Sequence, residues 1–257
     1  MTAPRVVLFD LDDTLFAHSH AVASGVAAYR AAHGGALAAA DDAVELARWY
    51  ELEEHHYHRY LAGEIDYREQ RRHRARGFVE PFGLDLSSDT DADDWFGRYI
   101  VEYQRAWVLY DDALPCLDAL AASIPGVRFG VVTNAELPFQ KAKMDATGLS
   151  ERIGTTIASG DVGVAKPHPR IFQAACERLR VDPGDAVYVG DRLDTDAIGA
   201  ASAGLRGVWL DRNGRAGDDE RERAAASAVR IITSLTELPA LLSEARYQRH
   251  VPFRRRV

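Results

Sequence analysis

The chain has 257 residues, of which 47% are hydrophobic and 27% charged, as in ordinary globular proteins. Its 31 basic and 39 acidic residues give a net charge of -8, which argues against a general surface for nucleic acids. Two distant cysteines, Cys116 and Cys176, predict reduced core thiols and a cytoplasmic protein. No apolar run approaches the roughly 20 residues of a membrane span, so we expect neither a signal peptide nor a membrane partner.

Four short apolar runs that end in polar residues predict buried parallel strands, at Val6–Asp10, Val127–Asn134, Ala186–Asp191 and Arg206–Asp211. Helical patterns lie between them, at Leu114–Ala122, Glu136–Thr147, Pro169–Leu179 and Asp194–Ala203. Gly148 and Gly204 fall where helix C-caps are expected, and Ser234–Glu237 is a capping box that predicts a final helix. The alternation predicts an α/β fold with a doubly wound, Rossmann-like parallel sheet.

Residues 17–107 interrupt this alternation. They show no strand pattern but contain long helical patterns at Asp42–Leu61 and Asp91–Trp107. We therefore expect a helical domain of residues 17–107, inserted into an α/β core of residues 1–16 and 108–257. Its linkers would lie near Phe16 and Leu109–Asp112.

Acidic residues follow the first predicted strand directly, in the segment Asp10-Leu-Asp12-Asp13-Thr14. The carboxyl ends of parallel strands face the ligand crevice, so Asp10 should lie at the bottom of such a site. Two acids spaced i, i+2 can both turn toward one metal ion, one through its side chain and the other through its backbone carbonyl. Magnesium prefers such oxygen ligands.

The later strand and loop ends carry complementary groups. Thr133 and Asn134 offer a hydroxyl and an amide, both able to bind a phosphoryl oxygen. Lys166, followed by Pro167 and Pro169, which fix the backbone, could neutralise the charges of a nucleophile and a phosphate. The segment Asp191–Asp196 supplies a carboxylate cluster suited to a divalent cation. Each feature alone also fits a turn, a helix cap or a surface lysine, but together they predict one shared site.

These segments resemble, in the same order, the four motifs of the haloacid dehalogenase (HAD) superfamily. Asp10–Leu15 looks like the first motif, Val132–Asn134 like the second, Lys166–Pro167 like the third and Gly190–Asp196 like the fourth. The resemblance covers essentially the whole chain. The helical insertion falls where one class of members carries a mobile cap, which implies a HAD core with a helical cap domain.

The resemblance implies a role for four of these residues. Asp10 would attack phosphorus and form an aspartyl-phosphate, and Asp12 would protonate the leaving oxygen and later activate water. Thr133 and Lys166 would hold the phosphoryl group. Physically, this is covalent catalysis with electrostatic stabilisation of the transferred group.

The resemblance also implies a magnesium cofactor, bound by Asp10, the Asp12 carbonyl and Asp191. Asp196 would support the metal site or hold Lys166. Many members have Asn before that last acid, whereas Thr195 stands here, which leaves the finer hydrogen bonding of the site open.

The implied activity is hydrolysis of a small phosphorylated metabolite by a phosphoric monoester phosphatase. A phosphomutase stays open, because it would use the same two aspartates. Asp12 argues against a 2-haloacid dehalogenase, which has no second acid two residues on, and the intact motifs argue against an inactive binding protein. The substrate and the oligomeric state, a homodimer included, are left open by the sequence.

The predicted helical insertion has three further features. Glu53–His58 could bind zinc, but glutamates four residues before His55 and His58 favour a charge-paired helix. The five arginines of Arg68–Arg76 could reach a second anionic group of the substrate or face solvent. Four aromatic residues are expected in the core of this domain, namely Trp49, Tyr50, Trp95 and Tyr99.

Overall fold

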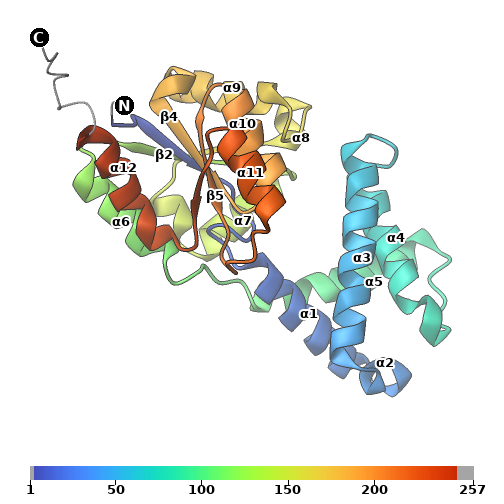
Figure 1. Ribbon diagram of the computed structural model, residues 1–257. Coiled ribbons are helices and arrows are strands. Elements are labelled where there is room, and N and C mark those ends of the chain that lie inside the picture. The colour runs from blue at the N-terminus through green and yellow to red at the C-terminus, as the bar shows by residue number, and fades with distance from the viewer. Residues whose placement is uncertain (1–2, 248–257) are drawn as a thin grey trace, which may run out of the picture. The chain divides into compact units, whose positions relative to one another are not determined.

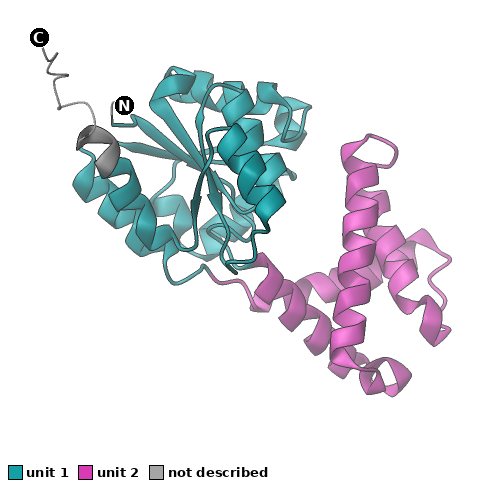
Figure 2. Cartoon of the chain, in the orientation of Figure 1, with its two compact units in different colours: residues 1–17, 109–257 teal, residues 18–108 magenta. Residues whose placement is uncertain are grey.

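The computed structural model describes residues 3–247, which divide into two compact units. Unit 1 comprises residues 1–17 and 109–257, and unit 2 comprises residues 18–108 (Figure 2). The sequence placed the corresponding boundaries after residues 16 and 107. The basic tail at 246–257, expected from the sequence to be frayed surface, lies almost entirely outside the described residues.

Unit 1 is built on a six-stranded parallel sheet with the order β3-β2-β1-β4-β5-β6. The strands are β1 (Val6–Phe9), β2 (Arg128–Thr133), β3 (Thr155–Ala158), β4 (Ala186–Gly190), β5 (Arg206–Leu210) and β6 (Arg230–Ile232). The chain adds β2 and β3 on one side of β1 and the later strands on the other. The prediction of a doubly wound α/β fold is confirmed, and its topological switch point lies between β1 and β4.

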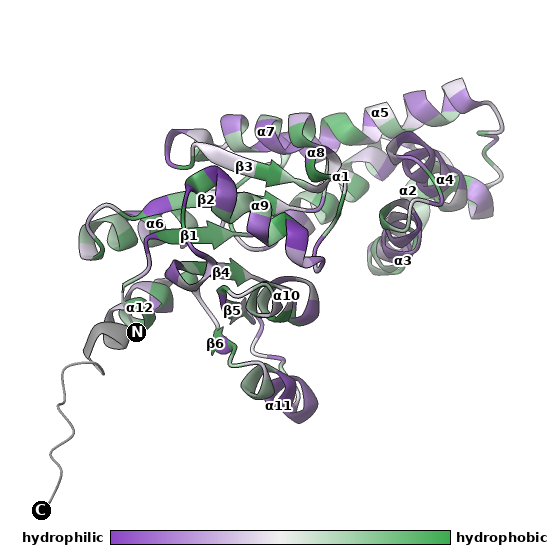
Figure 3. Ribbon diagram, turned by 90° about the horizontal axis from the view of Figure 1, so that it is seen from above, coloured by the Kyte–Doolittle hydropathy of each residue, from purple (hydrophilic) through white to green (hydrophobic). Residues whose placement is uncertain are grey.

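Helices cover both faces of the sheet (Figures 1 and 3). They are α6 (Ala113–Ser123), α7 (Leu137–Ala146), α8 (Ser159–Val162), α9 (Pro169–Leu179), α10 (Gly199–Ser202), α11 (Asp218–Ala226) and α12 (Leu238–Tyr247). Because parallel crossovers are right-handed, α6 and α7 lie on one face and α9, α10 and α11 on the other. Helix α12 packs beside α6, after the predicted Ser234–Glu237 capping box.

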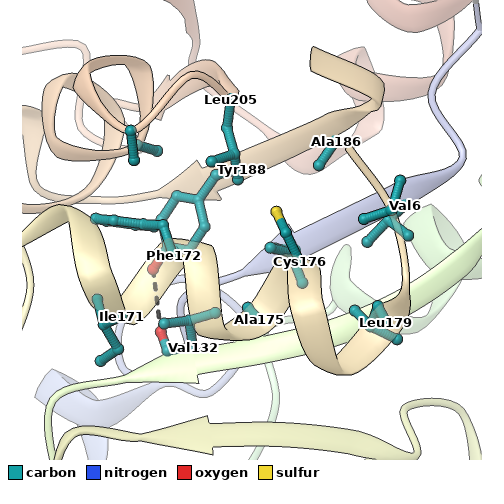
Figure 4. Packing of buried hydrophobic residues seen from close by; sticks show 14 residues of the cluster. Val6, Val132, Ile171, Phe172, Ala175, Cys176, Leu179, Ala186, Tyr188 and Leu205 are labelled. Atoms are coloured by element: carbon teal, nitrogen blue, oxygen red, sulfur yellow. Dashed lines mark hydrogen bonds between the residues drawn. The ribbon is translucent and has the colours of Figure 1, made fainter. Parts of the chain in front are cut away.

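The core between α9 and the sheet is continuous (Figure 4). Phe172 and Cys176 of α9 pack toward Val6 of β1 and Tyr188 of β4, and the rings of Phe172 and Tyr188 meet edge to face with centroids 5.0 Å apart. Full burial of a large apolar side chain stabilises a fold by about 1.5–3 kcal/mol. Cys176 and the equally buried Cys116 are free thiols, as predicted.

Two edge strands were not predicted, and one predicted helix has a different geometry. Figure 3 shows β1 and β4 in the green of hydrophobic residues, whereas Thr155–Ala158 is half-buried and Arg230–Ile232 has only three residues. Both lie next to a single neighbour, so neither carries a continuous apolar run. The predicted helix Asp194–Ala203 begins with a π-helical turn, Leu193–Ile198, a geometry found mostly at functional sites.

Unit 2 contains five α-helices and no strand among its described residues. They are α1 (His18–His33), α2 (Gly35–Ala39), α3 (Asp42–Leu61), α4 (Tyr67–Val79) and α5 (Asp89–Arg105). Trp49, Trp95 and Tyr99 are buried together, and the centroids of Trp49 and Tyr99 lie 4.4 Å apart. Tyr50 differs from its prediction: it is only partly buried, and its hydroxyl donates to the Ser19 carbonyl at 3.0 Å.

Ion pairs within unit 2 occupy most of the arginine run. Arg72 and Arg76 of α4 bind Asp89 at 2.6 and 2.7 Å, and buried Arg74 binds Glu53 of α3 at 2.8 Å. These side chains therefore connect neighbouring helices. His58 binds Glu54 at 2.8 Å, as the charge-paired reading of that segment predicted. None of the helices in the described part of the chain has the length and apolar character that a membrane span requires.

Candidate active site

Asp10 lies at the carboxyl end of β1, at the switch point of the sheet. Its backbone N–H donates to the carbonyl of Val189 at 2.8 Å, which extends the pairing between β1 and β4 by one residue. Its side chain is buried with only 6% of the residue exposed. The sheet therefore fixes this carboxylate in the crevice that parallel strands form at their carboxyl ends.

Lys166 binds three other side chains of the site. Its Nζ donates to Oδ1 of Asp10 at 2.5 Å, to Oδ1 of Asp196 at 2.7 Å and to the hydroxyl of Tyr188 at 2.9 Å. An ammonium has three N–H donors, so these three bonds account for all of them. Burial alone lowers the pKa of Lys166, but the charges of Asp10 and Asp196 raise it above its usual value. The lysine therefore stays a cation.

Asp196 is held in place by the strand end that precedes it. Its Oδ2 accepts the backbone N–H of Arg192 at 3.0 Å, while Oδ1 receives Lys166. A Cβ added at Gly190 would lie 2.4 Å from Cβ of Asp196, so the aspartate folds back over a position that only glycine can occupy. The bond to Lys166 is the contact that one of the two roles implied for Asp196 requires.

Three carboxylates lie close together at this end of the sheet. Oxygens of Asp10, Asp191 and Asp196 all lie within 4.8 Å of one another. Burial, with contributions from the Asp196 and Asp12 charges, raises the pKa of Asp10 to about 7. Burial and the same kind of repulsion raise the pKa of Asp191 well above its usual range. The cluster is short of positive charge and consists of oxygen donors, so its chemistry fits a divalent cation such as Mg²⁺.

Thr133 and Asp12 are joined by a side chain that was not predicted. Gln140 on α7 donates from Nε2 to Oγ1 of Thr133 at 2.7 Å and to Oδ2 of Asp12 at 2.9 Å. Lys143, one turn further along α7, donates to Oδ1 of Asp12 at 2.6 Å. The Asp12 carboxylate is thus held by α7, while the predicted metal contact of this residue involves only its backbone carbonyl.

Asn134 makes contacts that the sequence did not predict. Its Nδ2 donates to the Lys166 carbonyl at 2.9 Å, and its Oδ1 accepts the Lys166 backbone N–H at 2.7 Å. The sequence assigned this amide to a phosphoryl oxygen, but both of its ends bind the loop that carries the lysine. Asn134 therefore orients the Lys166 loop. Its predicted contact with a phosphoryl oxygen stays a prediction, because an amide nitrogen has a second N–H donor.

Arg212, after β5, supports the turn that follows Asp10. Its guanidinium donates to the carbonyls of Asp13 and Thr14 at 3.3 and 2.6 Å and pairs with both carboxylate oxygens of Asp112 at 2.9 and 3.0 Å. The ring of Tyr110 stacks on the guanidinium at 3.8 Å. Asp13 has a left-handed backbone with φ of 57°, which is uncommon for a residue other than glycine. These bonds hold that conformation.

The four predicted segments converge at one edge of the sheet. Asp10, Lys166, Asp191 and Asp196 form one cluster, and Thr133 and Asp12 are linked beside it. The residues missed by the sequence are Tyr188, Gln140, Lys143 and Arg212. For Lys143, the scarcity of lysine in the sequence could have served as a signal. The chain contains only three lysines, and two of them, Lys143 and Lys166, lie in this site.

A model of the haloacid dehalogenase-like hydrolase family matches residues 4–204. The match covers most of the chain, so the chain belongs to the haloacid dehalogenase-like hydrolases. The fold is similar to that of the HAD-hydrolase YfnB from Bacillus subtilis bound to magnesium, with a TM-score of 0.76 and 20% identity over 94% of this chain and 99% of that one. A 2-haloacid dehalogenase from Pseudomonas syringae has a similar fold, with a TM-score of 0.64 and 26% identity over 95% of this chain and 99% of that one.

Several curated relatives are named as phosphatases. The chain is 36% identical over 117 residues to a phosphoserine phosphatase of Thermus thermophilus, a match that covers 46% of both chains. It is 39% identical over 116 residues to a glyceraldehyde 3-phosphate phosphatase of Methanopyrus kandleri, covering 43% of this chain and 49% of the relative. An N-acylneuraminate-9-phosphatase of Mus musculus is 34% identical over 136 residues, or 52% of each chain. The chain spans about half the length of the curated relatives it matches.

Proposed function

We propose that this protein is a magnesium-dependent phosphatase that hydrolyses a small phosphorylated metabolite through an aspartyl-phosphate on Asp10. One observation carries the proposal: a buried carboxylate at a strand end binds the Lys166 ammonium and lies within 4.8 Å of an oxygen of Asp191. A second acid, Asp12, lies two residues on. The relatives named phosphatases support the same chemistry, since each is named for a small phosphate ester.

In the first step, a carboxylate oxygen of Asp10 attacks phosphorus as the bond from phosphorus to the ester oxygen breaks. Asp12 gives its proton to the departing alkoxide, so the products are an alcohol and an aspartyl-phosphate. Lys166 and the Thr133 hydroxyl stabilise the charge on the phosphoryl oxygens. The bond from Lys166 to Asp10 at 2.5 Å also aims the carboxylate.

In the second step, Asp12 takes a proton from a water molecule, which attacks phosphorus and releases inorganic phosphate. Asp10 regains its carboxylate, and Asp12 ends the cycle protonated, which is the form that the first step needs. The side chain of Asp12 is 30% exposed, so it can exchange protons with solvent. In the structure it is paired with Lys143, which corresponds to the proton-free form that accepts a proton from water.

Magnesium would be held by Asp10, Asp191 and the backbone carbonyl of Asp12, and it would supply the positive charge that lets an anionic nucleophile approach an anionic phosphate. Asp196 takes no direct part in this set, because its oxygens bind Lys166 and the backbone of Arg192.

Asp12 also argues against haloacid dehalogenation, in which no alkoxide needs a proton. Two buried free thiols, Cys116 and Cys176, support a reducing, cytoplasmic compartment.

Turnover of para-nitrophenyl phosphate with magnesium, before and after EDTA, tests this function. We expect EDTA to stop hydrolysis and added magnesium to restore it. Asp10→Asn should abolish turnover while circular dichroism shows an intact fold, because an amide is a poor nucleophile. Near-normal turnover in Asp10→Asn would remove the mechanism, and activity that is indifferent to the chelator would remove the metal.

A panel of phosphorylated metabolites then identifies the substrate. Serine phosphate, glyceraldehyde 3-phosphate and N-acylneuraminate 9-phosphate are natural starting compounds, because relatives are named for them.

A further inference from the structure

Helix α7 places two buried polar side chains beside the proposed phosphoryl-binding site, although neither belongs to the four motifs. Gln140 has no exposed surface, and Lys143 is 2% exposed. Gln140 spans Thr133 and Asp12 with its Nε2 group, at 2.7 and 2.9 Å, and Lys143 binds the same aspartate at 2.6 Å. Fully buried amides and ammonium groups are uncommon in helix cores unless they have such partners.

We propose that Gln140 and Lys143 are positioning residues that aim the Thr133 hydroxyl at the phosphoryl group. This inference rests on the proposed function, because it assigns the direction of a hydrogen bond within that site. Three contacts support it, from Lys143 to Asp12, from Asp12 to Gln140 and from Gln140 to Thr133, and each one fixes the orientation of the next side chain.

The first contact fixes Asp12 as an acceptor. The Lys143 ammonium lies 2.6 Å from Oδ1 of Asp12 and also lies over the ring of Phe16, 4.8 Å from its centroid. In its proton-free form, which the second step needs, Asp12 has no proton to donate, so its Oδ2 binds Gln140 by accepting a hydrogen.

The second contact fixes the amide of Gln140. If the amide were turned over, its Oε1 would face Oδ2 of Asp12 at hydrogen-bond distance, and two acceptors repel each other. The NH₂ group must therefore face Asp12 and Thr133. Its Oε1 is left buried without a hydrogen-bond partner among the described residues, which is costly for an acceptor. The Nε2 bonds to Asp12 and Thr133 therefore hold the Gln140 amide in this orientation, although Oε1 lacks a partner.

The third contact fixes Thr133. Its Oγ1 accepts a hydrogen from Gln140, which is its one hydrogen-bond partner among the residues that the structure describes. A hydroxyl has one proton and two lone pairs, so the proton is left to point elsewhere. Without Gln140, the hydroxyl would lose this donor and its proton could turn away from the phosphoryl group, so that Thr133 would offer lone pairs to an anionic phosphoryl oxygen. Gln140 prevents that orientation.

A double-mutant cycle between Gln140 and Thr133 tests the inference. The variants are Gln140→Leu, Thr133→Val and the pair, with kcat and KM for para-nitrophenyl phosphate and the inhibition constant of inorganic phosphate. Gln140→Leu leaves the Thr133 hydroxyl free to turn away from the charged phosphoryl group. It should therefore lower kcat/KM by about 10-fold or more and weaken inhibition by phosphate. In the Thr133→Val background, the same change should cost less than about twofold, because Gln140 acts through the hydroxyl.

Lys143→Met adds a second, matched comparison. It removes the charge that fixes Asp12 at nearly constant side-chain length, whereas Lys141→Met makes the same change on the exposed side of α7. We expect Lys143→Met to lower kcat/KM and to weaken phosphate binding, and Lys141→Met to match wild type. A cooperative thermal unfolding transition establishes that each variant folds. If Gln140→Leu does not fold, Gln140→Met takes its place in the cycle.

Equal losses for Gln140→Leu in both backgrounds would overturn the inference, as would no loss in either. So would a Lys143→Met enzyme that equals Lys141→Met. Wild-type protein that turns over no phosphate ester would overturn the proposed function itself, whereas an active wild type with an additive cycle would overturn only the roles of α7.

Discussion

Asp10→Asn should change how the stability of the metal-free protein depends on pH. Burial is the main reason that the pKa of Asp10 rises from 3.8 to about 7. A carboxyl whose pKa is raised by folding binds its proton more tightly in the folded state. Its stabilising contribution is therefore complete below the unfolded-state pKa and is lost as the pH rises through the folded-state pKa.

The interval from 3.8 to about 7 corresponds to about 4 kcal/mol. Between about pH 5 and about pH 8, more than half of it, roughly 3 kcal/mol, should be lost by the wild type but not by Asp10→Asn. Asp191 acts in the same direction, because its pKa is also raised by burial, and it is present in both proteins. Lys166 keeps its proton over this range, because its pKa is raised, so its own ionisation does not contribute to the difference.

Urea unfolding in EDTA, followed by far-UV circular dichroism at the two pH values, measures this difference. The exposed carboxylate of Asp161 provides a control, and Asp161→Asn should follow the wild type. Added magnesium should stabilise the wild type at the higher pH and have less effect on Asp10→Asn, since a ligand that binds only the folded state stabilises it. If the free energy of unfolding in EDTA changed with pH equally in wild type and Asp10→Asn, the conclusion that burial raises the pKa of Asp10 would be refuted.

Gly190→Ala should destabilise the fold by about 1–3 kcal/mol and lower turnover, because its Cβ would lie 2.4 Å from Cβ of Asp196; an unchanged melting temperature and rate would contradict this. Tyr188→Phe should cost about 1–3 kcal/mol in urea unfolding, because its hydroxyl donates to the Val132 carbonyl at 3.0 Å inside the core; a loss within experimental error would speak against it. Asp12→Asn should slow alkyl phosphates more than para-nitrophenyl phosphate, and equal losses across the series would exclude its acid role.

The sequence by itself determined the central architecture and most of the acidic site. β1 and β4 carry unbroken apolar runs because helices cover both faces of the sheet, and such runs are visible without coordinates. Asp10 and Asp191 follow those runs directly, so their convergence was predictable from the parallel arrangement alone. Asp42–Leu61 was predicted with the bounds that the structure shows, because a long helix repeats its pattern many times.

Only the tertiary structure decided which side chains orient the reactive groups. Gln140 and Lys143 lie on a helix remote in sequence from Asp12, separated from it by 128 and 131 positions, and Tyr188 has the pattern of an ordinary core residue. Asn134 ends a strand just as a ligand residue would, yet its amide binds the backbone of Lys166. Spacing along a strand predicts which end of the sheet a residue reaches. The partner of a polar side chain there depends on which helix packs beside it, and that is set by contacts between distant parts of the chain.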